Sequence, residues 1–262
     1  MKYSDIHEGI FLERPNRFIA WVQMDGRREK VHVKNTGRCR ELLQEGAQVW
    51  LEKSANPSRS TAYDLVTVRK GDRLVNMDST APNKAAEEWL RAGGLYPDVT
   101  EVRPECTFGK SRFDFRVRVR AGADAQADVP ADMFEEEIWI EVKGVNLEED
   151  NVALFPDAPS ERAVKHVEEL MEAKKEGYGA VLLFVVQMEG ITHFMPNVRT
   201  QPEFAGALLR ARKAGVRIMA VGCEVKEDGM RISYEIPVVL PQEPKTAEKG
   251  SASAIAPRLL PW

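Results

Sequence analysis

The sequence of 262 residues has few cysteines, no long apolar run and no large excess of charge of one sign. Its three cysteines, Cys39, Cys106 and Cys223, lie far apart and form no CxxC pair, which argues against a zinc ribbon and a disulfide framework. The longest apolar run, residues 180–186, is too short to cross a bilayer, and the first residues lack the apolar core of a signal peptide. The four histidines have no metal-ligand spacing. We therefore expect a cytoplasmic protein with free thiols and no membrane partner.

The charge of the chain is distributed unevenly. The formal net charge is −4, but residues 1–80 carry +3 and residues 81–262 carry −7. A mildly basic first part is compatible with a polyanionic partner. A strongly basic coat is absent, so nucleic-acid binding has to be argued from particular sites. The length is sufficient for two modest domains.

Two segments of alternating polarity lie near the middle of the chain, SRFDFRVRVR at residues 111–120 and EEEIWIEVKG at residues 135–144. Alternation with period two predicts strands, and the polar joint at residues 121–134 predicts an antiparallel pair. A symmetric connection puts Asp114 opposite Glu141, with Lys143 further along the same face. Such a group can hold a hard divalent cation and place an ammonium beside a phosphate. The alternative is a solvated sheet face with a cross-strand ion pair.

Residues 1–80 are predicted to be all-β. Five short strands, with a small helical insertion at residues 38–43, favour a closed five-stranded barrel of the OB type. These strands are expected at residues 17–24, 30–34, 47–53, 61–69 and 73–77. Barrels of this kind often bind single strands through basic and aromatic side chains. The candidates are Arg14, Arg17, Trp21, Arg27, Arg28, Lys30 and Lys34. The alternative is a plain small barrel whose aromatic side chains fill its core.

Residues 81–240 are predicted to form a second domain with a mixed central sheet flanked by helices, so that the whole chain is α/β (α+β). Asn83 is expected to cap a first helix, on which Glu87 and Glu88 lie at the two margins of the apolar stripe. Ser160 is expected to cap a helix that runs to Lys175. A buried strand at residues 179–186, a helix at residues 202–214 and a strand at residues 216–221 follow. Residues 241–262 have little apolar periodicity and are predicted to be a disordered tail.

This order of elements, with an aspartate on the second strand of the sheet and Glu-x-Lys closing the third, resembles the PD-(D/E)xK nuclease fold. More specifically, the chain is similar to the sugar fermentation stimulation protein A family over about residues 10–240. The blocks that carry the resemblance include RPNRFIAWV (14–22), HVKNTGR (32–38), SRFDF (111–115), IEVKGV (140–145) and FPDAPSERAVKH (155–166). The chain departs from the family pattern at Ala163, where glycine is common, and at Ser160, where threonine is common.

The resemblance implies an OB-like domain, a nuclease-like domain, DNA binding and a link to the expression of sugar-utilisation genes. It implies a catalytic group of Asp114, Glu141, Lys143 and Glu88, with Mg²⁺ or Mn²⁺ held by Asp114, Glu141, the carbonyl of Val142 and Glu88. Arg112 and Lys165 are candidate phosphate clamps. Lys165 and His166 are either ordinary surface residues or directed toward the carboxylates.

Two alternative hypotheses about function stay open besides a metal-dependent nuclease. One is a non-catalytic DNA-binding regulator, because a nuclease fold can act by binding alone. The other is an RNA-binding barrel joined to a processing enzyme.

Overall fold

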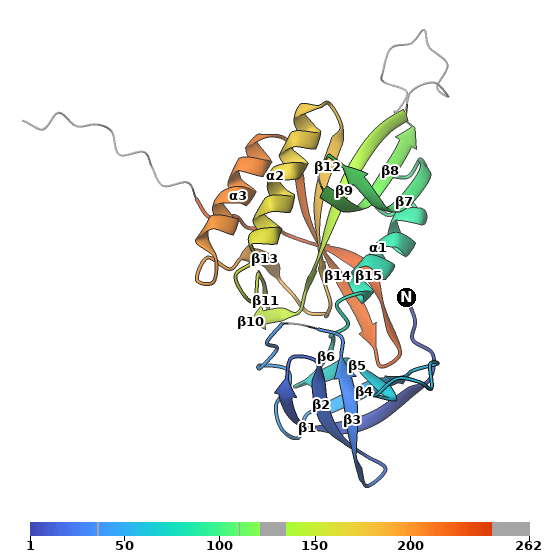
Figure 1. Ribbon diagram of the computed structural model, residues 1–262. Helices are drawn as coiled ribbons and strands as arrows, with labels where there is room; N and C mark the ends of the chain where they lie inside the picture. Colours follow the sequence, from blue (N-terminus) through green and yellow to red (C-terminus); the bar gives the residue numbers. More distant parts are fainter. Residues whose placement is uncertain (36, 110, 121–134, 243–262) are drawn as a thin grey trace, which may run out of the picture.

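The computed structural model describes residues 1–35, 37–109, 111–120 and 135–242, so the predicted joint at 121–134 and residues 243–262 of the predicted tail lie outside the described residues. The first part of the chain is a β-barrel, drawn in blue to cyan in Figure 1. Its strands are β1 (Ile6–Asn16), β2 (Ile19–Met24), β3 (Arg27–Val33), β4 (Gln48–Lys53), β5 (Tyr63–Lys70) and β6 (Arg73–Asn76). They follow the order β3-β2-β1-β4-β5-β6, and a pairing of β3 with β5 closes the barrel over five strands. The predicted OB-like barrel is confirmed.

The set of barrel strands differs from the prediction in one respect. β1 was not predicted, because only Gly9 and Phe11 are buried along its length and it shows no regular alternation. The strand at Arg73–Asn76 is therefore the sixth, and it extends the sheet from β5. In the predicted helical insertion at residues 38–43, Leu43 N donates to the Cys39 carbonyl at 2.9 Å, which is a single helical turn and does not extend into a helix.

The second part of the chain is a six-stranded mixed sheet between helices, with a small three-stranded sheet on the side of the barrel (Figure 1). The helices are α1 (Ala81–Arg91), α2 (Glu161–Lys175) and α3 (Pro202–Lys213). The strands of the large sheet, in spatial order, are β15 (Gly229–Ile236), β14 (Arg217–Lys226), β12 (Gly179–Val186), β9 (Glu135–Val145), β8 (Ser111–Arg120) and β7 (Val99–Phe108). The small sheet contains β10 (Leu147–Glu149), β11 (Val152–Phe155) and β13 (His193–Pro196). Within the described residues, no helix has the length and apolarity needed to cross a membrane.

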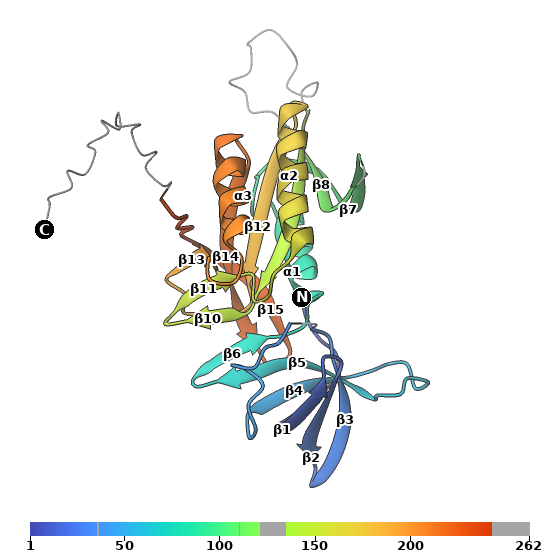
Figure 2. The ribbon, with the colours of Figure 1, turned by 60° about the vertical axis from the view of Figure 1, so that its left-hand side comes forward.

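The large sheet is covered on both faces. All eight residues of β12 are buried, and this strand runs parallel to both of its neighbours, as its unbroken apolar sequence predicts. On one face α1 packs Ala86 and Leu90 against the sheet. On the other face α2 and α3 lie together, and Figure 2 shows both in front of the sheet. The Ser160 hydroxyl accepts a hydrogen bond from Ala163 N at 3.1 Å, so the predicted cap of α2 is confirmed.

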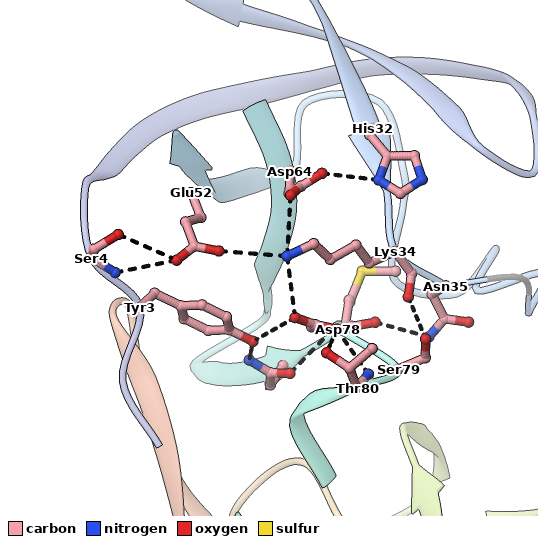
Figure 3. Close-up of polar contacts among 12 residues, drawn as sticks. Tyr3, Ser4, His32, Lys34, Asn35, Glu52, Asp64, Asp78, Ser79 and Thr80 are labelled. Atoms are coloured by element: carbon pink, nitrogen blue, oxygen red, sulfur yellow. Dashed lines mark hydrogen bonds and ion pairs between the residues drawn. The ribbon is translucent and has the colours of Figure 1, made fainter. Parts of the chain in front are cut away.

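A buried ionic network joins the barrel to the turn that precedes α1 (Figure 3). At its centre, Lys34 Nζ lies 3.1 Å from Asp64 Oδ2, 3.5 Å from Glu52 Oε2 and 3.6 Å from Asp78 Oδ2. Asp78 is fully buried, and its Oδ1 accepts hydrogen bonds from the backbone and the hydroxyl of Thr80, both at 2.8 Å. The network therefore fixes the start of α1 relative to the barrel.

Acid should weaken the barrel through Asp64. Burial alone raises the pKa of this carboxyl, but hydrogen bonds from Arg59, His32 and Lys34 outweigh that effect and hold the pKa well below its usual range. A folded-state pKa below the unfolded value stabilises the fold at higher pH, and this stability is lost as the pH falls below about 4. Asp64→Asn should lower the free energy of unfolding at pH 7 by about 2 kcal/mol.

The difference between wild type and Asp64→Asn in urea unfolding should stay constant from pH 6 to about pH 4 and shrink as the pH falls further toward pH 3. Asp72→Asn, an exposed aspartate in the turn between β5 and β6, is the matched control and should change stability little at any pH. A difference that stays constant across this range would show that the Asp64 carboxylate does not stabilise the fold through its charge.

Candidate active site

Asp114 and Glu141 face each other where β8 and β9 separate. The last backbone pair of this antiparallel ladder is Phe115 with Ile140, so the next position places Asp114 opposite Glu141. The predicted register is therefore confirmed. Past that pair, Asp114 Oδ2 accepts a hydrogen bond from Val142 N at 2.7 Å. The carboxylate thus occupies the place of a backbone partner and is fixed against β9.

Helix α1, which lies on the face of the sheet opposite α2 and α3, also contacts the Asp114 carboxylate. Asn83 Nδ2 donates to Asp114 Oδ1 at 2.7 Å. Asn83 is not the helix cap that its sequence context predicts, because the N-cap is Thr80 and Pro82 lies within the first turn. Proline is tolerated in that turn, where its missing N–H needs no partner. The earlier start leaves the Asn83 side chain free to orient Asp114.

Glu141 is the most buried acid of the group, at 2 % exposure. Its Oε1 accepts a hydrogen bond from Lys143 Nζ at 2.6 Å and is also hydrogen-bonded to His166 Nδ1. Its Oε2 is buried and accepts no hydrogen bond from any described residue. Alternation alone predicts that the polar face of β9, which carries Glu141, is exposed to water. In the structure this face is covered, and Trp139 on the same face is only 5 % exposed.

His166 is held in place from helix α2. It is 5 % exposed, and Arg162 Nε donates to its Nε2 at 3.3 Å. Because Nε2 accepts this hydrogen bond, Nδ1 carries the ring proton and donates a hydrogen bond to Glu141. His166 is thus directed toward the carboxylates, which its position in the first turns of the helix left open. Lys165, one residue earlier, points outward and pairs with Glu169 at 3.5 Å.

The electrostatics of the two carboxyl groups differ. Burial raises the pKa of Asp114, and the charge of Glu141 adds to the rise, which the hydrogen bonds from Val142 and Asn83 oppose without cancelling. Burial also raises the pKa of Glu141, but the hydrogen bond from His166 and the charge of Lys143 outweigh burial and hold this pKa below its ordinary value. Negative charge is therefore stabilised at Glu141 and destabilised at Asp114. A cation at this cluster would relieve the repulsion between them.

The donors at the cluster fit an oxygen-seeking divalent cation that keeps part of its water shell. Among the described residues, no three His, Cys, Asp or Glu side chains are grouped to hold a metal ion. Two carboxylates and the carbonyl of Val142 are nevertheless a sufficient protein contribution for Mg²⁺, which usually retains several waters. The buried Oε2 of Glu141 has no hydrogen-bond donor among the described residues, so its negative charge is left for such an ion to compensate.

The structure does not bring Glu88 into the cluster. Its Oε2 lies 2.5 Å from the Met1 amine, and its side chain is 62 % exposed. Glu88 follows Asn83 by five residues, which places the two about 140° apart around the helix. Glu87 lies nearer the Asn83 side but pairs with Arg91 at 2.7 Å. The residue of α1 that contacts the site is therefore Asn83, and the assignment of Glu88 as the helix acid is corrected.

The predicted nucleic-acid contacts lie in two places. Four are on the barrel, where Arg17 occupies the turn between β1 and β2 and Arg27, Arg28 and Lys30 belong to β3. Arg28 pairs with Glu13 and stacks over Trp21, with its guanidinium 4.5 Å from the ring centroid.

The other two lie in the second domain. Arg112, on β8 two residues before Asp114, pairs with Glu105 and is 65 % exposed in its side chain. Lys165 is similarly exposed, at 59 %. Each is within reach of solvent near the carboxylates, but neither contacts them.

Comparisons with known proteins cover nearly the whole described chain. Residues 12–77 match the family model for the SfsA N-terminal OB domain, and residues 80–229 match that for the sugar fermentation stimulation protein RE domain. Sugar fermentation stimulation protein homologues from Ruminiclostridium cellulolyticum and Desulfitobacterium hafniense are 48 % and 49 % identical over 240 residues. These matches span 92 % of this chain and 100 % and 99 % of the relatives.

A solved structure shares the fold. The SfsA protein of Pyrococcus furiosus, determined in complex with Ca²⁺, superposes with a TM-score of 0.78 at 27 % identity. The alignment covers 92 % of this chain and 98 % of the archaeal one. With a barrel followed by a mixed sheet, matched by family models over both parts, the chain belongs to the sugar fermentation stimulation protein (SfsA) family.

Proposed function

We propose that this protein binds DNA and carries a divalent-metal-dependent phosphodiesterase site, that is, a nuclease site. The observation that carries the proposal is the junction of β8 and β9, where Asp114 and Glu141 are opposed and Lys143 bonds Glu141. Glu141 Oε2 is buried beside them and receives no hydrogen bond from the part of the chain that the structure describes. An acid pair with an adjacent ammonium is suited to phosphoryl chemistry, which depends on positioning and on stabilising charge.

Asp114, Glu141 and the carbonyl of Val142 are the groups that would hold Mg²⁺ or Mn²⁺. When bound, such an ion supplies Lewis-acid polarisation of the phosphate oxygens. The archaeal relative was solved with Ca²⁺, another hard cation that prefers oxygen ligands. A divalent cation bound to a relative of the same fold supports the proposal that this chain also binds one.

The remaining residues hold the two carboxylates in place and stabilise negative charge on the phosphate. Asn83 and Val142 N fix the two oxygens of Asp114, and His166 fixes Glu141, so that both carboxylates are held before a substrate arrives. Lys143 presents its ammonium to the charge that develops on the phosphate. Arg112 and Lys165 are exposed cations near the site and can bind flanking phosphates. Arg17, Arg27, Arg28 and Lys30 extend phosphate contact onto the barrel.

A non-catalytic DNA-binding regulator of sugar-utilisation genes is the second candidate. The observation that favours it is the internal pairing of the cluster, in which Lys143 and His166 both bond Glu141 and no third acid is contributed by α1. A carboxylate pair satisfied in this way can be structural.

Metal titration distinguishes the two candidates at the level of the site. Asp114→Asn removes a ligand charge with little change of shape, and it should weaken the binding of Mn²⁺ by about tenfold or more in isothermal titration calorimetry. Asp72→Asn makes the same substitution at an exposed position and should bind Mn²⁺ as wild type does. Equal affinities in all three proteins would mean that the carboxylates hold no metal.

In parallel with the metal titration, cleavage is tested on single-stranded DNA, duplex DNA and RNA, with Mg²⁺ or Mn²⁺ and with EDTA as the control. A nuclease should cut at least one substrate only when the metal is present, and Asp114→Asn should be inactive. DNA binding without cleavage of any substrate would leave the regulator as the function.

A further inference from the structure

A groove lined by arginines opens on the barrel next to the second domain. It has a volume of about 590 Å³ and is lined in part by Arg14, Arg17, Arg38, Arg40, Glu13 and Glu45. Arg17, Arg38 and Arg40 are exposed and form no ion pair with any described residue, whereas Glu13 is paired with Arg28. We call this feature the arginine groove. Its free cations are suited to a polyanion.

Arg14 shapes the arginine groove rather than lining it as a free charge. Its two terminal nitrogens donate to four backbone carbonyls, those of Arg17, Asn35, Gly37 and Arg38, at 2.6–2.9 Å. These bonds hold both walls of the groove at a fixed separation. Phe18, beside Arg17, is 50 % exposed, and the Arg17 guanidinium lies 5.6 Å from its ring centroid. An exposed ring next to free arginines is a platform on which an unpaired base can stack.

A second, smaller cavity begins where the arginine groove ends. This interdomain pocket has a volume of about 170 Å³ and is lined by Asn35 and Gly37 of the barrel and by Gly144, Asn146 and Asp157 of the second domain. Gly37 lines both cavities. Gly144 directly follows Lys143 on β9. The two cavities therefore adjoin at Gly37, and the second one reaches the residue next to Lys143. We trace a path along them from the barrel toward the candidate active site.

The walls of the interdomain pocket are fixed. The Ser79 hydroxyl and backbone both donate to the Lys34 carbonyl, at 2.6 and 3.0 Å, and Asn35 Nδ2 donates to the Met77 carbonyl at 3.0 Å (Figure 3). A Cβ at Gly37 would lie 2.5 Å from Asp157 Oδ2, so Gly37 packs closely against Asp157 and a side chain would not fit at this position of the wall. At about 170 Å³ the pocket is below the ~300 Å³ at which drug-sized ligands begin to fit. It has room for one unpaired base but not for a base pair.

From this path we infer that the substrate of the site is single-stranded nucleic acid, which runs along the arginine groove, stacks on Phe18 and passes the interdomain pocket to Lys143. The inference rests on the proposed function and adds the strand type to it. Phosphates contact Arg17, Arg38 and Arg40, and the amide of Asn146, which lines the pocket, meets the edge of the base. A duplex is too wide to follow this path.

Binding in EDTA tests the path without cleavage. The probes are a labelled DNA oligonucleotide of about 20 nucleotides, longer than the ~4–16 that one OB fold covers, its duplex and the RNA of the same sequence. The single-stranded DNA should bind at least about tenfold more tightly than the duplex, and the RNA arm shows whether the sugar matters. Arg38→Gln/Arg40→Gln should weaken single-strand binding about tenfold and reduce the salt slope by about 1.4, from two lost phosphate contacts.

Two further variants make the result specific. Arg210→Gln/Arg212→Gln removes the same charge at the same spacing from exposed positions of α3 and should bind every probe as wild type does. Phe18→Ala keeps all charges and should weaken only single-strand binding, about tenfold, through lost stacking.

The outcomes separate this inference from the proposed function. Equal affinity for duplex and single strand, or single-strand binding unaffected by Arg38→Gln/Arg40→Gln and by Phe18→Ala, would overturn the path while leaving DNA binding intact. Failure of wild type to bind any nucleic acid would overturn the proposed function itself.

Discussion

Lys143→Ala should reduce nucleic-acid cleavage by about 10²-fold or more while leaving DNA affinity nearly unchanged. The ammonium of Lys143 bonds Glu141 Oε1 at 2.6 Å and is only 14 % exposed in its side chain, so it is held at one place beside the carboxylates. A fixed charge at the reacting centre acts mainly on the transition state. One phosphate contact among many is a small part of the total electrostatic attraction to DNA. The measurement is nicking of supercoiled plasmid and cutting of a single strand in Mn²⁺, beside filter binding of both proteins.

The chain offers a matched control in a second Glu-x-Lys tripeptide. Lys226 Nζ lies 3.3 Å from Glu224 Oε1 at the end of β14, and its side chain is 70 % exposed. Lys226→Ala removes the same group from the same tripeptide and should leave cleavage unchanged. Cleavage that persists in Lys143→Ala would identify a contaminating nuclease, and loss of cleavage in both variants would mean that the effect is not specific to the site.

The register of the central strand pair could be predicted because it depends on local pattern. Alternation with period two fixes which residues share a face, and a symmetric connection then places Asp114 opposite Glu141. The fully apolar run of β12 and the serine cap of α2 are equally local signals, and both elements are found where they were predicted. The strand and the cap are each encoded in one short segment, and the register in two such segments and the length of the joint between them.

The partners of the carboxylates could not be predicted in this way. Burial of Glu141 depends on α2 lying across the strand and bringing His166 to it, which is a tertiary contact. The Pro82-Asn83 pair predicts a helix cap at Asn83, yet the helix begins at Ala81, and Asn83 contacts Asp114 from inside its first turn. Glu88 and Glu87 are symmetric in the apolar periodicity of the helix, and only the packing shows that neither meets the acid pair.

The ionic network at the junction of the two domains also could not be predicted from the sequence. Its residues come from β3, β4, β5 and the turn before α1, so no local pattern links them. Among the residues that the structure describes, Lys34 is the only cation that forms an ion pair with Asp78. Burial opposes the charge of Lys34, but the negative charges of Asp78, Asp64 and Glu52 outweigh it and raise the pKa of Lys34. The ammonium is therefore charged throughout the physiological range.

Lys34→Met should lower the free energy of unfolding by about 3 kcal/mol at pH 7. The substitution keeps the length of the side chain but leaves the fully buried Asp78 and the nearly buried Asp64 facing each other without the ammonium between them. Removal of one partner of a buried ion pair usually costs about 3–5 kcal/mol, and we take the low end because Lys34 is 23 % exposed.

The measurement for Lys34 is urea unfolding followed by circular dichroism, with Lys53→Met as the control. Lys53 is exposed at the end of β4 on the same barrel, so its replacement should change stability by less than about 0.5 kcal/mol. The loss in Lys34→Met should diminish when Asp78→Asn is added, because the second change removes the carboxylate that was left unpaired. If the double variant is instead less stable by the sum of the two single losses, Lys34 and Asp78 do not act as a pair, and the joint between barrel and second domain rests on other contacts.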